Sequence, residues 1–218
     1  MAANIITLGR ILLVFLVLFL FQAGFYLRLF ATMLTIFIIY LDSLDGYVAR
    51  KLGVASDFGA LFDITGDRIV EHLYLIFYAA MGLISFWVPA IFVTRSFLVD
   101  TLRSVAYSRE GKTPFGDKTM MKSSISQFLT ASRFSRGVYG VSKVVTFVLL
   151  GIILALTQGY DEGVRWIQES WFSKLNILST SLVWTMVIFN LIRGIPVLID
   201  GRFYLFEKYL PRTLKSDN

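Results

Sequence analysis

Apolar stretches of about twenty residues, the length that a helix needs to cross a bilayer, recur along the whole 218-residue chain. Hydrophobic residues make up 56% of the sequence and the mean hydropathy is +0.68, values that are typical of an integral membrane protein. No linker, low-complexity block or internal repeat divides the chain. The sequence therefore predicts one all-α integral membrane domain over residues 1–218.

The apolar stretches predict six transmembrane helices. A short segment, 1–10, precedes the first, and its apolar run lacks a good signal-peptide cleavage site, so we expect this helix to be retained. A polar, basic segment is expected at 108–136, an interfacial loop at 157–172 and an amphipathic, basic tail after residue 200. The predicted helices are approximately 11–27, 29–50, 57–82, 87–107, 137–156 and 175–199.

The positions of lysine and arginine predict the topology. With both termini in the cytoplasm, segment 108–136, the tail and most other basic residues lie on the cytoplasmic side, and only Arg28, Arg165 and Lys174 lie opposite. The net charge of +6 is then topological and lipid-facing, and no nucleic-acid partner is expected. Without cysteine and with one histidine, thiol chemistry and His-rich metal sites are excluded. We expect a protein of the cytoplasmic (inner) membrane.

Four aspartates stand out between residues 42 and 67. Asp42 and Asp45 lie on one helical stripe of the second predicted helix, and Asp63 and Asp67 lie four residues apart on the third. The turn between these helices is short, so the helices are expected to pack antiparallel with their acidic stripes facing each other. Asp42 lies about 12 Å along the helix from its cytoplasmic end, which predicts a polar cavity open to the cytoplasm.

The negative charges of four carboxylates so close together must be neutralised. Each costs about 2.5–3.5 kcal/mol on a membrane helix, and a close pair repels by roughly 4 kcal/mol at an effective dielectric near 20. Oxygen ligands alone favour a hard ion such as Mg²⁺, Mn²⁺ or Ca²⁺. Either several of the four carboxylates are protonated, or divalent cations lie among them. The simpler interpretation, helix-end carboxylates solvated at the interface, explains one or two acids better than four.

The spacing D-x2-D-G-x2-A-R-x8-G-x3-D-x3-D resembles the signature of the CDP-alcohol phosphatidyltransferase family at all specified positions. The resemblance implies an enzyme that transfers a phosphatidyl group from CDP-diacylglycerol, or a related CDP-alcohol, to a hydroxyl acceptor and releases CMP. It also implies a homodimer and two divalent cations, Mg²⁺ or Mn²⁺. The implied roles are metal ligation by Asp42, Asp45, Asp63 and Asp67, general-base catalysis by Asp67, and nucleotide binding by Asp42, Gly46, Ala49, Arg50 and Gly59.

Basic residues in the later helices suggest the acceptor. Arg95, Arg103, Lys143 and Arg193 lie in or near the predicted cytoplasmic halves of their helices, where a charged residue is a candidate for anion binding. If they line the cavity, the acceptor carries a phosphate. The alternative is that these side chains reach the interface or pair with Asp100 and Glu71.

Two short patterns point to different phosphorylated acceptors. Arg95-x6-Leu102-Arg103, Gly140-x2-Lys143 and the opening Asn4…Thr7-Leu8-x-Arg10 resemble bacterial phosphatidylglycerophosphate synthases, which implies glycerol 3-phosphate and phosphatidylglycerol phosphate as product. Arg68, directly after Asp67, is similar to the Asp-Arg of phosphatidylinositol-phosphate synthases, which implies inositol phosphate.

Two other classes of membrane protein are alternatives to an enzyme. Intramembrane acids also occur in cation or proton transporters, but there they are distributed along a path, whereas here they cluster. A catalytically inactive scaffold is disfavoured because the acidic set is intact. Glu71 continues the acidic stripe one turn deeper, where it either pairs with an arginine or borders the site, and His72 is expected to be a packing residue.

Overall fold

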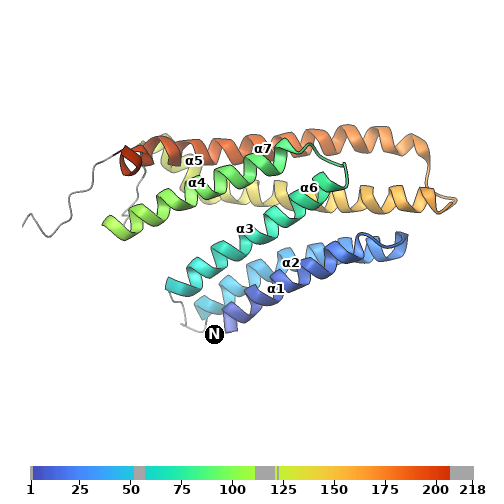
Figure 1. The fold of residues 1–218 in the computed structure, drawn as a ribbon, viewed down its shortest axis with the longest axis horizontal. Helices are drawn as coiled ribbons and strands as arrows, with labels where there is room; N and C mark the ends of the chain where they lie inside the picture. Colours follow the sequence, from blue (N-terminus) through green and yellow to red (C-terminus); the bar gives the residue numbers. More distant parts are fainter. Residues whose placement is uncertain (1, 52–56, 111–120, 122, 207–218) are drawn as a thin grey trace, which may run out of the picture. The chain divides into compact units, whose positions relative to one another are not determined.

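The computed structural model describes residues 2–51, 57–110, 121 and 123–206, and every regular element within these ranges is an α-helix (Figure 1). The prediction of an all-α chain is therefore confirmed. The helices are α1 (Ala2–Leu20), α2 (Phe25–Lys51), α3 (Asp57–Ala80), α4 (Trp87–Glu110), α5 (Ser124–Ala131), α6 (Arg133–Asp161) and α7 (Glu169–Phe206).

The chain forms two compact units. Unit one comprises Met1–Val93 and Val138–Ile188, and unit two comprises Thr94–Gly137 and Phe189–Asn218. Helices α4, α6 and α7 each contribute residues to both units. The single domain over residues 1–218 stays a prediction.

The helix boundaries depart from the sequence-based expectation in an ordered way. Helix α1 begins at Ala2, nine residues before the apolar run starts, so Arg10 lies inside a helix. Helices α6 and α7 both extend past their predicted apolar ranges, and α5 was not expected at all. Hydropathy detects only the lipid-soluble part of a helix, and polar turns continue the same backbone hydrogen bonding beyond it.

Two described stretches, Ser126–Asp161 and Glu169–Arg202, are long and apolar enough to cross a membrane, and two shorter apolar helices cover Asn4–Leu20 and Phe25–Leu41. The distribution of buried and exposed side chains on α1 indicates the surroundings of such a helix. Its buried face carries Thr7, Arg10, Val14 and Val17, whereas its exposed face carries Leu12, Phe15 and Phe19. A helix with polar side chains inside and large apolar ones outside is suited to lipid.

Aromatic rings form the core of unit one beside α3. Tyr74 and Tyr78 are fully buried; Tyr74 stacks on Tyr78 and on Phe147 of α6, and Tyr78 contacts Phe147 with its ring tilted. Their hydroxyls are satisfied, because Tyr74 donates to Thr35 Oγ1 at 3.0 Å and Tyr78 donates to the Phe147 carbonyl at 2.9 Å. These bonds fix α3 against α2 and α6 and thereby hold the helix that carries two of the aspartates.

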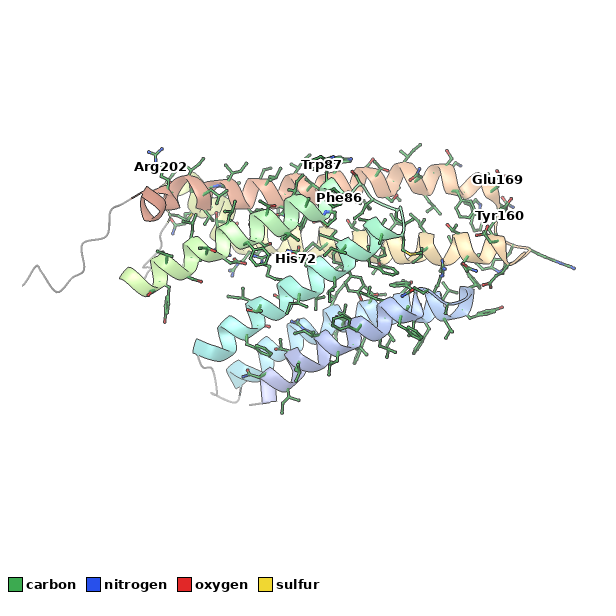
Figure 2. All side chains as sticks on the ribbon, viewed as in Figure 1. His72, Phe86, Trp87, Tyr160, Glu169 and Arg202 are labelled. Carbon is green, nitrogen blue, oxygen red and sulfur yellow. The ribbon has the colours of Figure 1, made fainter. Side chains whose placement is uncertain are left out.

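At the end of unit one where α2 begins, a polar cluster connects α2 with α6. Glu162 accepts the Phe25 backbone N–H at 3.2 Å, and Arg28 donates to the carbonyls of Ala23 and Leu154 at 2.8 and 3.0 Å. Glu162 therefore caps the start of α2. Tyr160 and Glu169 mark the same end in Figure 2, where the chain turns from α6 to α7.

Candidate active site

Helix α2 carries the first half of the acidic motif in its last turns. Residues 42–51 are helical, as predicted, so Asp42, Asp45, Gly46 and Ala49 occupy i, i+3, i+4 and i+7 positions of one stripe. The side chains of residues 42–50, including Arg50, lie outside the described residues. The roles predicted for these five residues therefore stay predictions.

Helix α3 carries the second half. Gly59, Asp63 and Asp67 follow one another at intervals of four residues along one face of this helix, as expected. The side chains of Asp63 and Asp67 are 42% and 44% exposed. Both side chains are therefore partly accessible to a ligand, although Oδ1 of Asp63 is itself buried.

An arginine that sequence reasoning did not place in the site contacts both acids. Arg10 Nη2 donates to Asp67 Oδ1 at 2.8 Å and lies 3.7 Å from Asp63 Oδ1. Arg10 comes from α1, and only 1% of the residue is exposed. A hydrogen bond between two charged groups at this distance is among the stronger polar contacts in proteins.

The close approach of α1 to α3 depends on Gly66. A Cβ at this position would overlap Thr7 Cγ2 and would lie 3.5 Å from Arg10 Nη2. Thr7 and Arg10 are one helical turn apart, and both are buried. Gly66 therefore lets α1 come near enough for Arg10 to reach the acidic stripe (Figure 1).

Glu71, one turn deeper on α3, lies in a closed network. Its side chain is 3% exposed and accepts from Tyr139 Oη at 2.9 Å and from Arg68 Nη1 at 3.1 Å. Lys143 Nζ lies 3.3 Å from Glu71 Oε1 and 4.9 Å from the centre of the Tyr139 ring. Of the two alternatives for Glu71, the structure shows the pairing with an arginine, Arg68. His72 lies midway along the same helix and is partly buried (Figure 2).

Lys143 is thus brought together with Glu71 in unit one, as the alternative interpretation of the basic residues anticipated. Its side chain is 26% exposed, and its ammonium group contacts Glu71. A role in binding the acceptor phosphate stays a prediction.

The three predicted arginines belong to unit two. Arg103 Nη1 lies 3.4 Å from Asp100 Oδ1, one turn away on α4. Arg193 on α7 donates to the backbone carbonyls of Ser135 and Thr130 at 3.0 and 3.4 Å. Pairing of Arg103 with Asp100 again matches the alternative interpretation, whereas these two bonds of Arg193 go to backbone carbonyls.

Arg95 packs directly on α7 at Gly194, where a Cβ would overlap its Nε, Cγ and Cδ atoms. Arg95 and Arg193 are 7% and 9% exposed. Two further polar groups of this unit, Thr130 Oγ1 and the Asn190 amide, are buried and have no hydrogen-bond partner among the described residues. Sequence reasoning did not single out Thr130 or Asn190.

The donor set on α3 suits a hard divalent cation. Carboxylate oxygens are the ligands that Mg²⁺ and Mn²⁺ prefer, and Asp63 and Asp67 present them at accessible positions on one helical face. Among the residues whose side chains are described, no group of three or more acidic, histidine or cysteine residues is assembled. Asp42 and Asp45, which would complete the set, are not among those residues.

Comparison with known proteins extends to nearly the whole chain. A sequence model of the family described as CDP-alcohol phosphatidyltransferase matches residues 1–203. A probable phosphatidylglycerophosphate synthase of Mycobacterium tuberculosis is 28% identical over 173 residues, which cover 77% of this chain and 82% of that protein.

Two further relatives match over shorter stretches. A CDP-diacylglycerol--glycerol-3-phosphate 3-phosphatidyltransferase of Mycoplasma genitalium is 36% identical over 69 residues, 32% of this chain and 29% of that protein. A protein of the same name from Bacillus subtilis is 34% identical over 64 residues, 29% of this chain and 33% of that protein. These two matches thus span about a third of the relatives' length.

Proposed function

Because the chain belongs to the CDP-alcohol phosphatidyltransferase family, we propose that it transfers a phosphatidyl group from CDP-diacylglycerol to glycerol 3-phosphate and releases CMP. Members of this family are membrane-embedded enzymes that act on a CDP-alcohol and an alcohol acceptor. The family match is the observation that carries the proposal, and the names of the relatives from Mycobacterium, Mycoplasma and Bacillus support glycerol 3-phosphate as the acceptor.

Asp42, Asp45, Asp63 and Asp67 are proposed to hold two divalent cations, Mg²⁺ or Mn²⁺. When bound, such ions neutralise the pyrophosphate of the nucleotide and stabilise the charge that develops during in-line displacement. The accessible carboxylates of Asp63 and Asp67 support this assignment. Gly46, Ala49, Arg50 and Gly59 are proposed to shape the nucleotide pocket together with Asp42.

Asp67 is proposed to accept the proton of the acceptor hydroxyl. The hydroxyl oxygen forms a bond to the lipid-bearing phosphorus, the bond from that phosphorus to the oxygen of CMP breaks, and CMP leaves with both bonding electrons. A carboxylate near cations is a weak base, so the positions of the two reactants supply much of the rate. The contact between Arg10 and Asp67 restricts where this carboxylate can point.

Arg95, Arg103, Lys143 and Arg193 are proposed to bind the acceptor phosphate. The planar guanidinium of an arginine can bind a phosphate through two parallel hydrogen bonds, which suits the three arginines to this role. An acceptor without phosphate would give these residues no evident partner. The runner-up acceptor is inositol phosphate, suggested by Arg68, but the structure directs one Arg68 nitrogen to Glu71.

An acceptor panel tests the proposal. Purified protein with radiolabelled CDP-diacylglycerol and Mg²⁺ is offered glycerol 3-phosphate, inositol phosphate, inositol or serine, and the labelled lipid and CMP are measured. We expect product with glycerol 3-phosphate. Conversion of inositol phosphate alone would favour the runner-up, and conversion of serine alone would overturn the phosphate-binding role of the arginines. A cation or proton transporter would release no metal-dependent CMP.

We further propose six spans, an inner-membrane location, a site that opens to the cytoplasm and a homodimer. The positive-inside pattern and the apolar outer face of α1 support the membrane topology. Since the sequence contains no cysteine, single cysteines at Ser108 and Gln168 report the two faces without background. An impermeant maleimide should label Ser108→Cys only in inside-out vesicles and Gln168→Cys only in right-side-out ones. The reverse pattern would contradict the orientation.

A further inference from the structure

Arg10 is a fully buried cation on a helix whose outer face is made of large apolar side chains. A charge in this position persists only where a partner compensates it. The partners are Asp67, whose Oδ1 accepts from Arg10 Nη2 at 2.8 Å, and Asp63, whose Oδ1 lies 3.7 Å away. Fifty-seven residues separate Arg10 from Asp67, so the contact is formed by the fold rather than by local sequence.

Arg10 and its two acidic partners differ in their exposure to solvent. The Arg10 side chain is 2% exposed, whereas the side chains of Asp63 and Asp67 are 42% and 44% exposed. Arg10 therefore approaches both acids from the protein interior and leaves their outer side open. The Nη2 atom of this guanidinium is directed at the two carboxylates.

We propose that Arg10 is a positioning residue for the transfer reaction, an inference that rests on the proposed function. It holds Oδ1 of Asp67, so that the carboxylate keeps one orientation and its open side stays available to the acceptor hydroxyl and the cations. Its charge also offsets the repulsion between Asp63 and Asp67. Gly66 belongs to this arrangement because it brings α1 close enough for the contact.

Arg10→Met and Arg10→Lys test the proposal in purified protein, with Arg28→Met as the matched control. Arg28 is also a buried arginine, but it donates to the carbonyls of Ala23 and Leu154 at the far end of α2. The measured quantities are kcat, KM for CDP-diacylglycerol, and Mn²⁺ affinity by electron paramagnetic resonance.

For Arg10→Met we expect kcat to fall about 10-fold to 100-fold with KM nearly unchanged, because loss of an orienting partner misplaces the carboxylate. Mn²⁺ should bind at least as tightly as to the wild type, since a positive charge beside its ligands has been removed. Arg10→Lys keeps the positive charge but lacks the planar guanidinium, so its kcat should lie between those of the wild type and Arg10→Met. Arg28→Met should keep the wild-type kcat and Mn²⁺ affinity.

An unchanged kcat in Arg10→Met would overturn the inference. A raised KM at constant kcat would also overturn it, because Arg10 would then bind a substrate. A parallel loss of kcat and Mn²⁺ affinity would indicate a structural role only. If Arg10→Met does not fold, Arg10→Lys decides, and wild-type kcat in that variant contradicts the proposal. Failure of the proposed function is distinct, since the wild type itself would then release no CMP while its Mn²⁺ binding could still be compared.

Discussion

Two carboxylate environments lie one turn apart on the same face of α3. Asp63 and Asp67 are more than two-fifths exposed, and Arg10 reaches both of them from the buried side. Glu71 is almost completely buried and is surrounded by Tyr139, Arg68 and Lys143. Asp63 and Asp67 therefore present accessible surface to a ligand, whereas the buried Glu71 is already in contact with two hydrogen-bond donors and an ammonium group.

This difference separates a ligand-binding acid from a structural one. A carboxylate that holds a metal must keep lone pairs available, whereas a carboxylate that fixes neighbouring helices uses its lone pairs on them. Glu71 continues the acidic stripe in sequence, but its partners make it part of the framework that supports α3 and α6. Substitution of Asp63 or Asp67 should therefore affect metal binding and activity, whereas substitution of Glu71 should affect stability.

The largest effect is expected for Asp67→Asn. Loss of the proposed general base should lower CMP release by about 10²-fold to 10⁴-fold. The assay is CMP release from CDP-diacylglycerol with glycerol 3-phosphate under saturating Mg²⁺. Asp161→Asn, the same change at an exposed acid at the end of α6, is the control and should retain wild-type activity. Equal activity of Asp67→Asn and the control would remove the catalytic assignment.

Glu71→Gln should affect stability. The change removes a charge that accepts from Arg68 and Tyr139 and lies beside Lys143, a loss of about 1.5–3 kcal/mol for hydrogen bonds to a charged group. For a chain of this size the thermal midpoint should fall by roughly 3–12 °C. Thermal unfolding in detergent measures it. An unchanged midpoint would mean that Glu71 is not part of the framework.

Tyr139→Phe tests the stabilising network around Glu71 with a smaller change. It deletes one donor to Glu71 but keeps the ring that Lys143 contacts at 4.9 Å. We expect a loss of about 1 kcal/mol and a correspondingly smaller shift of the thermal midpoint than in Glu71→Gln. If both variants unfold at the same temperature, the hydroxyl rather than the charge network accounts for the stability.

Asp63→Asn should have the smallest effect on stability. Its side chain is 42% exposed and its contact with Arg10 is long at 3.7 Å, while removal of its charge relieves repulsion with Asp67. The thermal midpoint without added metal should stay within about 2 °C of the wild type or rise slightly. A fall as large as that of Glu71→Gln would erase the distinction between the open and closed acids.

The sequence alone predicted the parts of this picture that depend on one helix. The stripes on α2 and α3 follow from the period of the helix, and the all-α class follows from the length of the apolar stretches. The contact of Arg10 with Asp67 could not be read in this way, because helix periodicity does not say which helices become neighbours. The signal was still present, since Thr7 and Arg10 lie one turn apart and interrupt the apolar pattern of α1.

Other partners were hidden for the same reason. Tyr139 and Lys143 reach Glu71 from a helix about seventy residues away, and Gly66 has no meaning until α1 lies against it. Polar helix extensions were also missed. Helix α5 is too short and too polar at its flanks for a hydropathy pattern to distinguish it from a basic loop.

Mn²⁺ binding to wild type, Asp63→Asn and Glu71→Gln tests the central claim most directly. Electron paramagnetic resonance of the purified proteins counts the bound ions without reference to any substrate. The account predicts two ions per wild-type chain, weakened binding in Asp63→Asn and wild-type binding in Glu71→Gln. Wild-type binding in Asp63→Asn together with its loss in Glu71→Gln would contradict the account, because the ions would then depend on the buried acid rather than on the open ones.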